Sequence, residues 1–408
     1  MVIRFSYLSL FFSFGILFFS RAFTFLFEMM PEGSASILFT PISLIFYVVS
    51  LYIIIHKIKY KSNLNVLLQS SFFPLIICSV AFISSFFSMY AGPSFIASSA
   101  LTGTFLFAAA LVICNDEDAL VKIVVTPLLL ALLVSIFFAI FIPSIGIDDG
   151  SEDPHHLGLW QGIFGFKNIL GRTAVFTMLF MLFSYFRGGG YKWFVWLIPI
   201  ICLLMSKSTT PIICFIVVLA SIYILNFYKR ISIAARLISI PIIIALGFIG
   251  FSIVTFIITD IFDKDLTGSG RTEMWSIILN NIDYQFFGYG FGGVFWGEGH
   301  PAEYTIGRLY YHLGHAHNGM VDAFIDMGYA GLIIYPLAIL TPYFVAIKRL
   351  FIGDSTYTLP LIFLTFLMFY SISGSSFIKQ NNILFLFYCV ATIYPAWKRI
   401  NECHISCR

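Results

Sequence analysis

The chain has 408 residues, of which 59% are hydrophobic and 11% charged, with a formal net charge of +3. Ordinary soluble domains carry roughly a quarter charged residues, so this composition excludes a soluble globular protein. The small net charge gives no reason to expect a nucleic-acid partner. Apolar segments recur from residue 5 to residue 397 without a polar domain between them, so we expect a single membrane domain over residues 1–408.

The apolar segments predict an all-α polytopic membrane protein with about 12 transmembrane helices. A spanning helix needs roughly 20 apolar residues, because lipid offers backbone groups no hydrogen-bond partners. The first segment has no cleavage site after it and is expected to remain as a span, and the seventh is short. The predicted spans are 5–27, 37–55, 65–88, 95–114, 123–143, 169–186, 193–205, 209–227, 237–259, 323–347, 357–374 and 381–397.

The Lys and Arg residues predict the orientation, because cytoplasmic loops collect basic residues. Fifteen of the 23 lie in one set of alternate loops, which puts both termini in the cytoplasm. Arg21 lies within the first span, toward its outer end. The opposite set of loops holds seven cations, which are Lys167, Arg172, Lys207, Lys264, Arg271, Arg308 and Lys379.

Two outer loops are long, at residues 144–168 and 260–322. The second lies between the ninth and tenth predicted spans and is rich in Gly, Tyr, Phe and Trp. Such a composition favours short interfacial helices that lie against the membrane. We expect function to be found in these loops.

The outward cations require compensation, because a charge at bilayer depth costs on the order of 3 kcal/mol. If the helices bundle, the cations at span ends would converge on one positively charged outward cavity. That cavity would suit a diphosphate, because Arg presents a planar fork to phosphate oxygens and Lys a point charge. The cations that sit at span ends beside small or polar residues are Lys167, Arg172, Lys207, Arg271 and Lys379.

The alternative for these cations is that they are scattered and snorkel toward water. That alternative suits Lys264 best, because it has Asp260, Asp263 and Asp265 beside it. For Arg21 both interpretations remain open.

A histidine motif, GHAHNGMVDAFIDMGYAGLIIY, precedes the tenth predicted span. The imidazole of His315 or His317 can take a proton from a hydroxyl near neutral pH, as glycosyl transfer to a sugar requires. A metal site is the weaker interpretation, because two histidines two residues apart, with no Cys beside them, form a poor ligand set. Interfacial histidines with structural hydrogen bonds are the remaining alternative.

Four motifs in this order resemble the O-antigen polymerase and ligase superfamily of bacterial membrane proteins. They are GFKNILGR, SKSTTP, GRTEMW followed by FFGYGFGG, and HAHNGMVDAFIDMGYAGL, and together they cover roughly residues 160–345. The histidine motif is most similar to the exopolysaccharide and O-antigen polymerase branch. The resemblance implies a membrane glycosyltransferase of about twelve helices, with a large periplasmic loop and arginines that hold a lipid diphosphate.

The resemblance also implies roles for single residues. Arg271 matches the Gly-Arg of one motif and His317 the His before Asn, so these two are the candidate catalytic residues. The candidate residues for binding the diphosphate and the substrate are Arg172, Lys167, Asn168, Arg21, Arg308, His315 and Asn318.

The resulting hypothesis is a glycan polymerase of the bacterial inner membrane with a periplasmic active site. It would transfer an undecaprenyl-diphosphate-linked glycan to a hydroxyl of another lipid-linked repeat unit, with inversion. Because the lipid diphosphate is already a good leaving group, we expect no metal, cofactor or nucleotide donor, and no phosphate-binding loop of the P-loop type is found. The expected partners are the lipid-linked glycan, the bilayer and a chain-length regulator.

Two alternatives stay open. An O-antigen ligase would use the same donor but transfer the glycan to lipid A core. A flippase or transporter for lipid-linked sugars would place charged residues near the bilayer midplane on broken helices.

Overall fold

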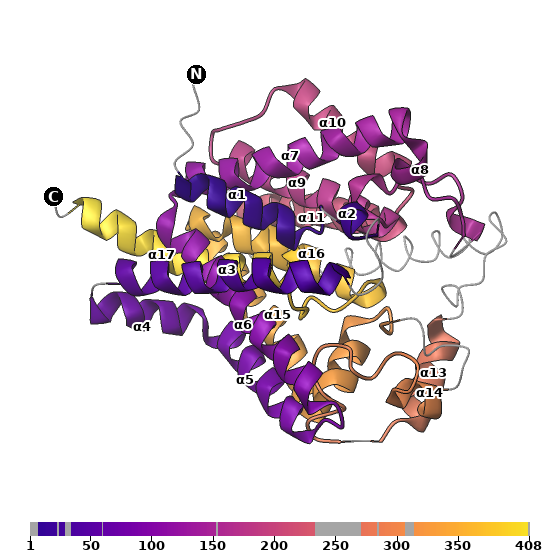
Figure 1. Cartoon of the computed structure of the whole chain (residues 1–408). Helices are drawn as coiled ribbons and strands as arrows, with labels where there is room; N and C mark the ends of the chain where they lie inside the picture. The colour runs from indigo at the N-terminus through magenta and orange to yellow at the C-terminus, as the bar shows by residue number, and fades with distance from the viewer. Residues whose placement is uncertain are drawn as a thin grey trace.

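The computed structural model describes residues 7–22, 24–28, 34–58, 60–151, 154–232, 271–283, 285–306 and 314–406. These residues form an all-α fold (Figure 1), and within them the one β-type pairing is an isolated bridge between Ile147 and Trp160. The predicted span at 237–259 lies outside the described residues.

Eight described helices are long and apolar enough to cross a membrane, and the count becomes nine if one bent pair forms a single span. The bent pair is α4 (Lys61–Ser70) and α5 (Phe72–Phe87), which meet at 69°. Two shorter apolar helices, α1 (Tyr7–Phe19) and α10 (Trp193–Met205), fall at the first and seventh predicted spans. The eight long helices are α3 (Ser34–Lys57), α6 (Ala91–Cys114), α7 (Glu117–Phe141), α9 (Lys167–Phe186), α11 (Thr209–Arg230), α15 (Gly319–Phe351), α16 (Thr358–Ser373) and α17 (Ile383–Ser406).

The structure shows breaks and shifted ends in some of the roughly twelve predicted spans. The first predicted span is split, because α1 ends at Phe19 and α2 runs over Thr24–Glu28. Arg21 lies in the turn between them with a φ of 64°, which ends the helical hydrogen-bond pattern. The third predicted span bends at Ser71, and the tenth starts earlier than predicted, at Gly319. Hydropathy detects apolar length but not such breaks in the backbone.

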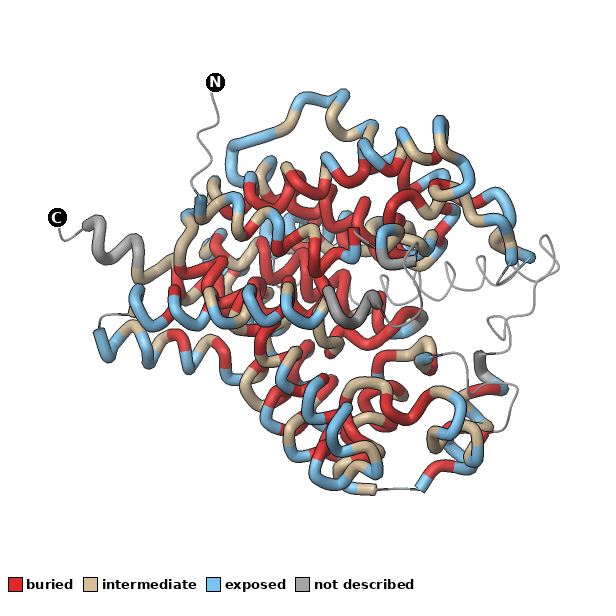
Figure 2. Tube along the Cα trace, viewed as in Figure 1, coloured by how far each residue is buried: buried red, intermediate tan, exposed pale blue. Residues whose placement is uncertain are grey.

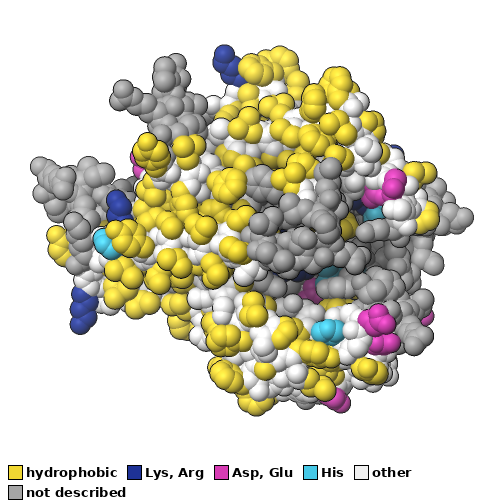
Figure 3. Space-filling view, viewed as in Figure 1, with side chains coloured by type: hydrophobic (Ala, Val, Ile, Leu, Met, Phe, Trp, Pro, Cys, Tyr) yellow, Lys and Arg dark blue, Asp and Glu magenta, His cyan; other side chains and the backbone are white. Residues whose placement is uncertain are grey.

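The helices α6, α9, α16 and α17 form the interior of the bundle, where most of their side chains are buried (Figure 2). Helices α3 and α11 lie outside and are mostly exposed, as expected for helices that face lipid. The space-filling view shows hydrophobic side chains over much of the visible helical surface (Figure 3).

Helix α15 is sharply kinked at Gly328, which has a φ of 61° and a ψ of −149°. A Cβ on Gly328 would lie 2.2 Å from the carbonyl oxygen of Gln285, so only glycine fits. Past the kink, a Cβ on Gly331 would lie 2.2 Å from the carbonyl oxygen of Ala323. The two helical segments therefore fold back on each other, and the two glycines of the motif MGYAGL allow this packing.

The two long loops that the sequence predicts to be outer contain short helices. Residues 144–168 include the end of α8 (Pro143–Gly146), with the 3-10 turns η1 (Pro154–His156) and η2 (Gly162–Phe164). The larger loop contains α13 (Arg271–Asn281) and α14 (Pro301–Thr305), which lie together below the main bundle in Figure 1. A second, smaller hydrophobic core, with Met274, Ile278, Phe295 and Phe324, joins α13 to the start of α15.

The glycine-rich segment after α13, residues 286–299, docks on α5 and α6. The backbone N–H of Phe291 donates to the hydroxyl of Ser84 at 3.1 Å. The Tyr90 ring stacks on His300 at 4.2 Å, and its hydroxyl donates to the carbonyl of Gly299 at 2.6 Å. The first half of the chain therefore supports the loop that carries the motifs.

Candidate functional site

The first two motifs meet at the start of α9. A Cβ on Gly171 would lie 2.9 Å from the side chains of both Ser206 and Ser208, so the helix packs directly on the turn that SKSTTP forms. The hydroxyl of Ser208 donates to the Asn168 side-chain oxygen at 2.8 Å. This packing fixes the first turn of α9, where Lys167 is half-buried and Asn168 is exposed.

Arg172, one turn into α9, is buried with 4% of its surface exposed. Its Cζ lies 5.9 Å from the centre of the Tyr370 ring on α16. Its Nε has no hydrogen-bond partner among the described residues. A buried guanidinium with an unused donor is costly unless a ligand or an ion satisfies it.

Arg21 and Lys379 share an electrostatic environment with Arg172. Arg21 is exposed at its turn, yet partial loss of hydration and the charge of Arg172 lower its pKa. Removal from water also lowers the pKa of Lys379. The nearby Asp322 carboxylate raises that pKa, and the charge of Arg21 lowers it further. Three cations from distant parts of the chain are therefore close enough to repel one another.

The histidine motif forms a loop held by buried hydrogen bonds. The indole N–H of Trp275, in GRTEMW, donates to the carbonyl of Ala316 at 2.7 Å. The Asp322 carboxylate, 8% exposed, accepts from the backbone N–H of Ala316 at 2.7 Å and of Ser376 at 3.2 Å. The third and fourth motifs thus form one structural unit with the loop between α16 and α17.

His315 and His317 are half-buried and lie face to edge, with ring centres 4.0 Å apart. The backbone N–H of His317 donates to Nδ1 of His315 at 3.3 Å. Asn318 caps α15, because its side-chain oxygen accepts from the N–H groups of Met320 and Val321. These contacts hold both imidazoles in place at the start of the helix.

The end of α16 connects the histidine loop to Arg172. Tyr370 lies beside the Arg172 guanidinium, and two residues later the carbonyl of Ile372 accepts from the side-chain amide of Asn318 at 3.4 Å. The hydroxyl of Tyr335 donates to Ser371 at 2.7 Å between these two contacts. The cation cluster and the histidines therefore lie at the same end of the bundle.

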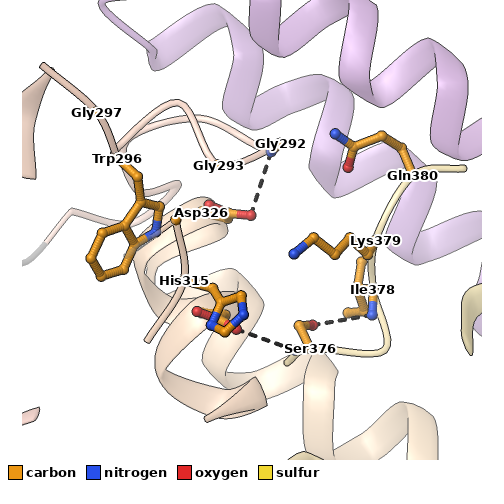
Figure 4. Close-up of a pocket in the computed structure, with 12 residues that line it drawn as sticks. Gly292, Gly293, Trp296, Gly297, His315, Asp326, Ser376, Ile378, Lys379 and Gln380 are labelled. Carbon is orange, nitrogen blue, oxygen red and sulfur yellow. Dashed lines mark hydrogen bonds between the residues drawn. The ribbon is translucent and has the colours of Figure 1, made fainter. Parts of the chain in front are cut away.

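A cavity of about 280 Å³ opens between three segments, the glycine-rich loop, the start of α15 and the loop before α17 (Figure 4). In Figure 4 the Lys379 ammonium points into this cavity, toward Asp326. Oδ2 of Asp326 accepts from the backbone N–H of Gly292 at 3.4 Å. The lining residues are Gly292, Gly293, Trp296, Gly297, Gly314, His315, Asp322, Asp326, Ser376, Ile378, Lys379 and Gln380.

Backbone strain is concentrated around this region. Among the described residues, four that are not glycine have a positive φ, and they are Arg21, Lys207, His317 and Asn381. Such conformations cost of order 1–3 kcal/mol each and cluster at functional sites. Three of the four are the basic or imidazole side chains that the sequence pattern had already singled out.

The structure brings together some predicted site residues and leaves others undescribed. Arg21, Arg172, His315, His317 and Asn318 lie at one end of the bundle, as described above. Arg271 is the first residue of α13, one turn before Trp275, but its side chain lies outside the described part of the chain, as does the whole of Arg308.

Sequence reasoning did not assign Asp322, Asp326, Trp296 or Gln380 to the site. It predicted that Lys379 would join the positively charged outward cavity, but did not name it as a site residue. A signal was present, because the two carboxylates lie four residues apart in a largely apolar helix and therefore on the same helix face. Among the described residues, no group of three His, Cys, Asp or Glu side chains is arranged to hold a metal ion.

Comparison with protein families identifies part of the chain. Residues 193–335 match the family model Wzy_C, described as O-Antigen ligase. No curated protein matches the chain. The matched region contains three of the four motifs, namely SKSTTP, GRTEMW with its glycine-rich segment, and the histidine motif up to Tyr335.

The match confirms the resemblance that the motifs indicated. It implies lipid-linked glycans as substrates and an activity of the ligase or polymerase type, in a multi-pass membrane protein. Residues 193–335 of this chain are therefore similar to the Wzy_C O-antigen ligase family of membrane glycosyltransferases.

Proposed function

We propose that this protein is a glycan polymerase, which transfers a lipid-linked glycan to a second lipid-linked repeat unit at the periplasmic face of a bacterial inner membrane. The supporting observation is the cluster of Arg21, Arg172 and Lys379 at the end of the bundle that carries the histidine loop. Three cations that repel one another favour a polyanionic ligand such as a lipid diphosphate.

The transfer is a single displacement. The acceptor hydroxyl oxygen bonds to the anomeric carbon of the donor sugar while the bond from that carbon to the diphosphate breaks. The lipid diphosphate leaves with the electron pair, and the hydroxyl proton passes to His317. Attack opposite the leaving group inverts the anomeric centre.

The cations act on the leaving group. Arg172 and Arg21 stabilise the charge that develops on the diphosphate, and shielding from water strengthens this effect. Lys167, Asn168 and Arg308 are proposed as outer contacts of the lipid-linked substrate. Arg271 is proposed as a further diphosphate contact, because α13 is held against the histidine loop by Trp275.

The remaining candidates act around the acceptor. His315 binds the substrate beside His317, and Asn318 orients both imidazoles through its helix cap. A chain-length regulator is proposed as a protein partner.

An assay with purified protein and lipid-linked repeat units alone tests the proposal. Elongation of the glycan without any nucleotide sugar is expected. Transfer to lipid A core, with no elongation, would instead identify a ligase. No transfer to either acceptor in membranes where the protein is folded would contradict both.

One observation favours the transporter alternative. Asp322 and Asp326 lie on a helix broken at Gly328, which resembles the broken helices of transporters. A flippase would move fluorescent lipid-linked units across proteoliposome membranes without changing their length. Translocation without elongation in such vesicles would support that alternative over the polymerase.

A further inference from the structure

The cavity beside the cation cluster is lined by a mixture of aromatic, amide, acidic and basic groups, whereas the cluster consists of cations. Its walls carry the indole of Trp296, the amide of Gln380, the Asp326 carboxylate and one ammonium, that of Lys379. Its floor is glycine backbone, and a Cβ on Gly293 would meet no atom within 4 Å. An aromatic wall with a few convergent donors and acceptors is suited to a polar ring such as a sugar.

The cavity volume limits the ligand to a small one. Sites for drug-sized ligands measure about 300–1,000 Å³. At about 280 Å³, this cavity has room for one sugar ring rather than an extended oligosaccharide. The rest of a repeat unit would have to lie outside it.

The charged groups that line the cavity favour an uncharged sugar ring as the ligand. Both Asp322 oxygens accept backbone N–H groups, and the Asp326 carboxylate accepts from the backbone N–H of Gly292, at a long 3.4 Å, and of Gly293. A carboxylate can accept about four hydrogen bonds, so Asp326 can accept more from sugar hydroxyls. A uronic acid here would face two carboxylates against the single ammonium of Lys379.

The position of the cavity indicates which sugar it holds. His315 forms part of the cavity lining, and the centre of the His317 ring lies 4.0 Å from the centre of the His315 ring. Lys379, on the opposite wall, connects it to Arg21 and Arg172. A sugar in the cavity would therefore lie between the proposed base and the diphosphate site, which is where an attacking hydroxyl must be.

We propose that this cavity is the acceptor subsite, which binds one uncharged sugar ring of the incoming repeat unit, with Asp326 and Gln380 as its polar contacts and Trp296 as its apolar wall. The inference rests on the proposed polymerase function. It adds a substrate class and roles for three residues, Asp326, Gln380 and Trp296, to which the sequence analysis gave none.

Competition with two probes tests the subsite. The first probe is the lipid-free oligosaccharide of one repeat unit, and the second is undecaprenyl diphosphate. Both should inhibit elongation by the wild-type protein. Asp326→Asn removes the charge but keeps the shape, and Gln380→Ala removes the amide, so each should weaken oligosaccharide inhibition about tenfold or more. Inhibition by undecaprenyl diphosphate should stay unchanged in both variants.

The matched control is Asp118→Asn, the same chemical change at an exposed residue at the start of α7. It should leave both inhibition constants as in the wild type. If Asp326→Asn weakens both probes equally, the cavity is not an acceptor subsite and the inference is overturned. If only inhibition by the diphosphate probe weakens, the cavity contacts the lipid diphosphate instead of the acceptor, which also overturns the inference.

A binding measurement separates this inference from the polymerase proposal. Quenching of tryptophan fluorescence by the oligosaccharide should be reduced in Trp296→Phe, and binding should weaken in Asp326→Asn, even if the purified protein elongates nothing. Binding without elongation would reject the polymerase and retain the subsite. Elongation with unaltered binding in Trp296→Phe, Asp326→Asn and Gln380→Ala would retain the polymerase and reject the subsite.

Discussion

The two ends of the helix bundle differ in the partners of their basic side chains. At the end where α9 and α17 finish, Arg187 lies 2.5 Å from Glu117, and Lys398 and the Tyr394 hydroxyl bond the other Glu117 oxygen. Close by, Arg399 pairs with Asp354. Cations at this end have carboxylate partners, and they tie the ends of four segments together.

At the opposite end, the cations lie near one another, and Lys379 also lies near Asp322 and Asp326. Among the described residues, Arg21, Arg172 and Lys379 form no ion pair within 4.0 Å, and the Arg172 charge lowers the pKa of Arg21. An arrangement that stabilised the fold alone would pair these charges, as the first end does. The difference supports the proposal that the second end receives an anion.

This contrast also fits the predicted orientation. Arg187, Lys398 and Arg399 belong to the loops that the positive-inside rule puts in the cytoplasm. We propose that the end with paired charges is cytoplasmic and that the cation cluster faces the periplasm.

Of the substitutions that test this comparison, replacement of His317 should have the largest effect on polymer formation. His317→Ala is expected to abolish polymer and leave single repeats, because general-base catalysis contributes roughly 10²–10⁴-fold. Surface glycans separated by gel electrophoresis measure the effect. His317→Asn is the matched variant, because Asn tolerates the positive φ of 53° but supplies no base. Normal polymer from His317→Asn would mean that this position matters only for backbone conformation.

Matched substitutions at the two ends test the comparison directly. Arg172→Gln should lower the elongation rate by roughly 10²–10³-fold, the usual cost of losing one preorganised charge contact. Arg187→Gln should lower thermal stability but leave the elongation rate of the folded protein near the wild-type value, because Arg187 binds only protein groups. Equal losses of rate in both variants would remove the distinction between the ends.

The pH dependence of elongation tests whether the charge of Lys379, in the cation cluster, is used in the reaction. Its pKa is lowered, so elongation that needs its charge should decline at a pH below the ordinary lysine value of about 10.4. Lys379→Arg keeps the charge at high pH and should shift that decline upward. The neighbouring charges, from Asp322, Asp326, Arg21 and Arg172, are the same in both proteins. Superimposable profiles between pH 7 and 10.5 would show that this ammonium does not titrate in the reaction.

The smallest effect is expected at the paired end. Burial alone would raise the pKa of Asp354, but hydrogen bonds from Thr356 and Arg399 lower it overall. Its stabilising contribution is therefore present above the ordinary Asp value of about 3.9 and is lost as the pH falls through the lowered value. Asp354→Asn should cost at most about 1 kcal/mol at pH 7, because the pair is partly exposed. Thermal unfolding at pH 7 measures this, and elongation should not change.

The polar lining of the site shows what sequence reasoning could reach. Arg172, His315 and His317 were predictable, because each stands in a motif beside small or polar residues. Asp326 was not assigned, and Lys379 was predicted only as one of the converging outward cations, because nothing in a linear pattern shows that residues 53 positions apart share one cavity. The split of the first predicted span at Arg21 also escaped prediction, since hydropathy averages over a single turn.

The sequence by itself determined that this protein is helical and lies in a membrane, because the solvation cost of the backbone in lipid acts locally on each apolar segment. It also indicated the resemblance that the Wzy_C match over residues 193–335 confirms, through short motifs whose residues are neighbours in the chain. The meeting of Arg21, Arg172 and Lys379 was decided only by the tertiary structure. That meeting depends on close contacts between helices and loops, such as Gly171 on Ser208 and Gly288 on Gly328, and such contacts exist only once distant segments have packed.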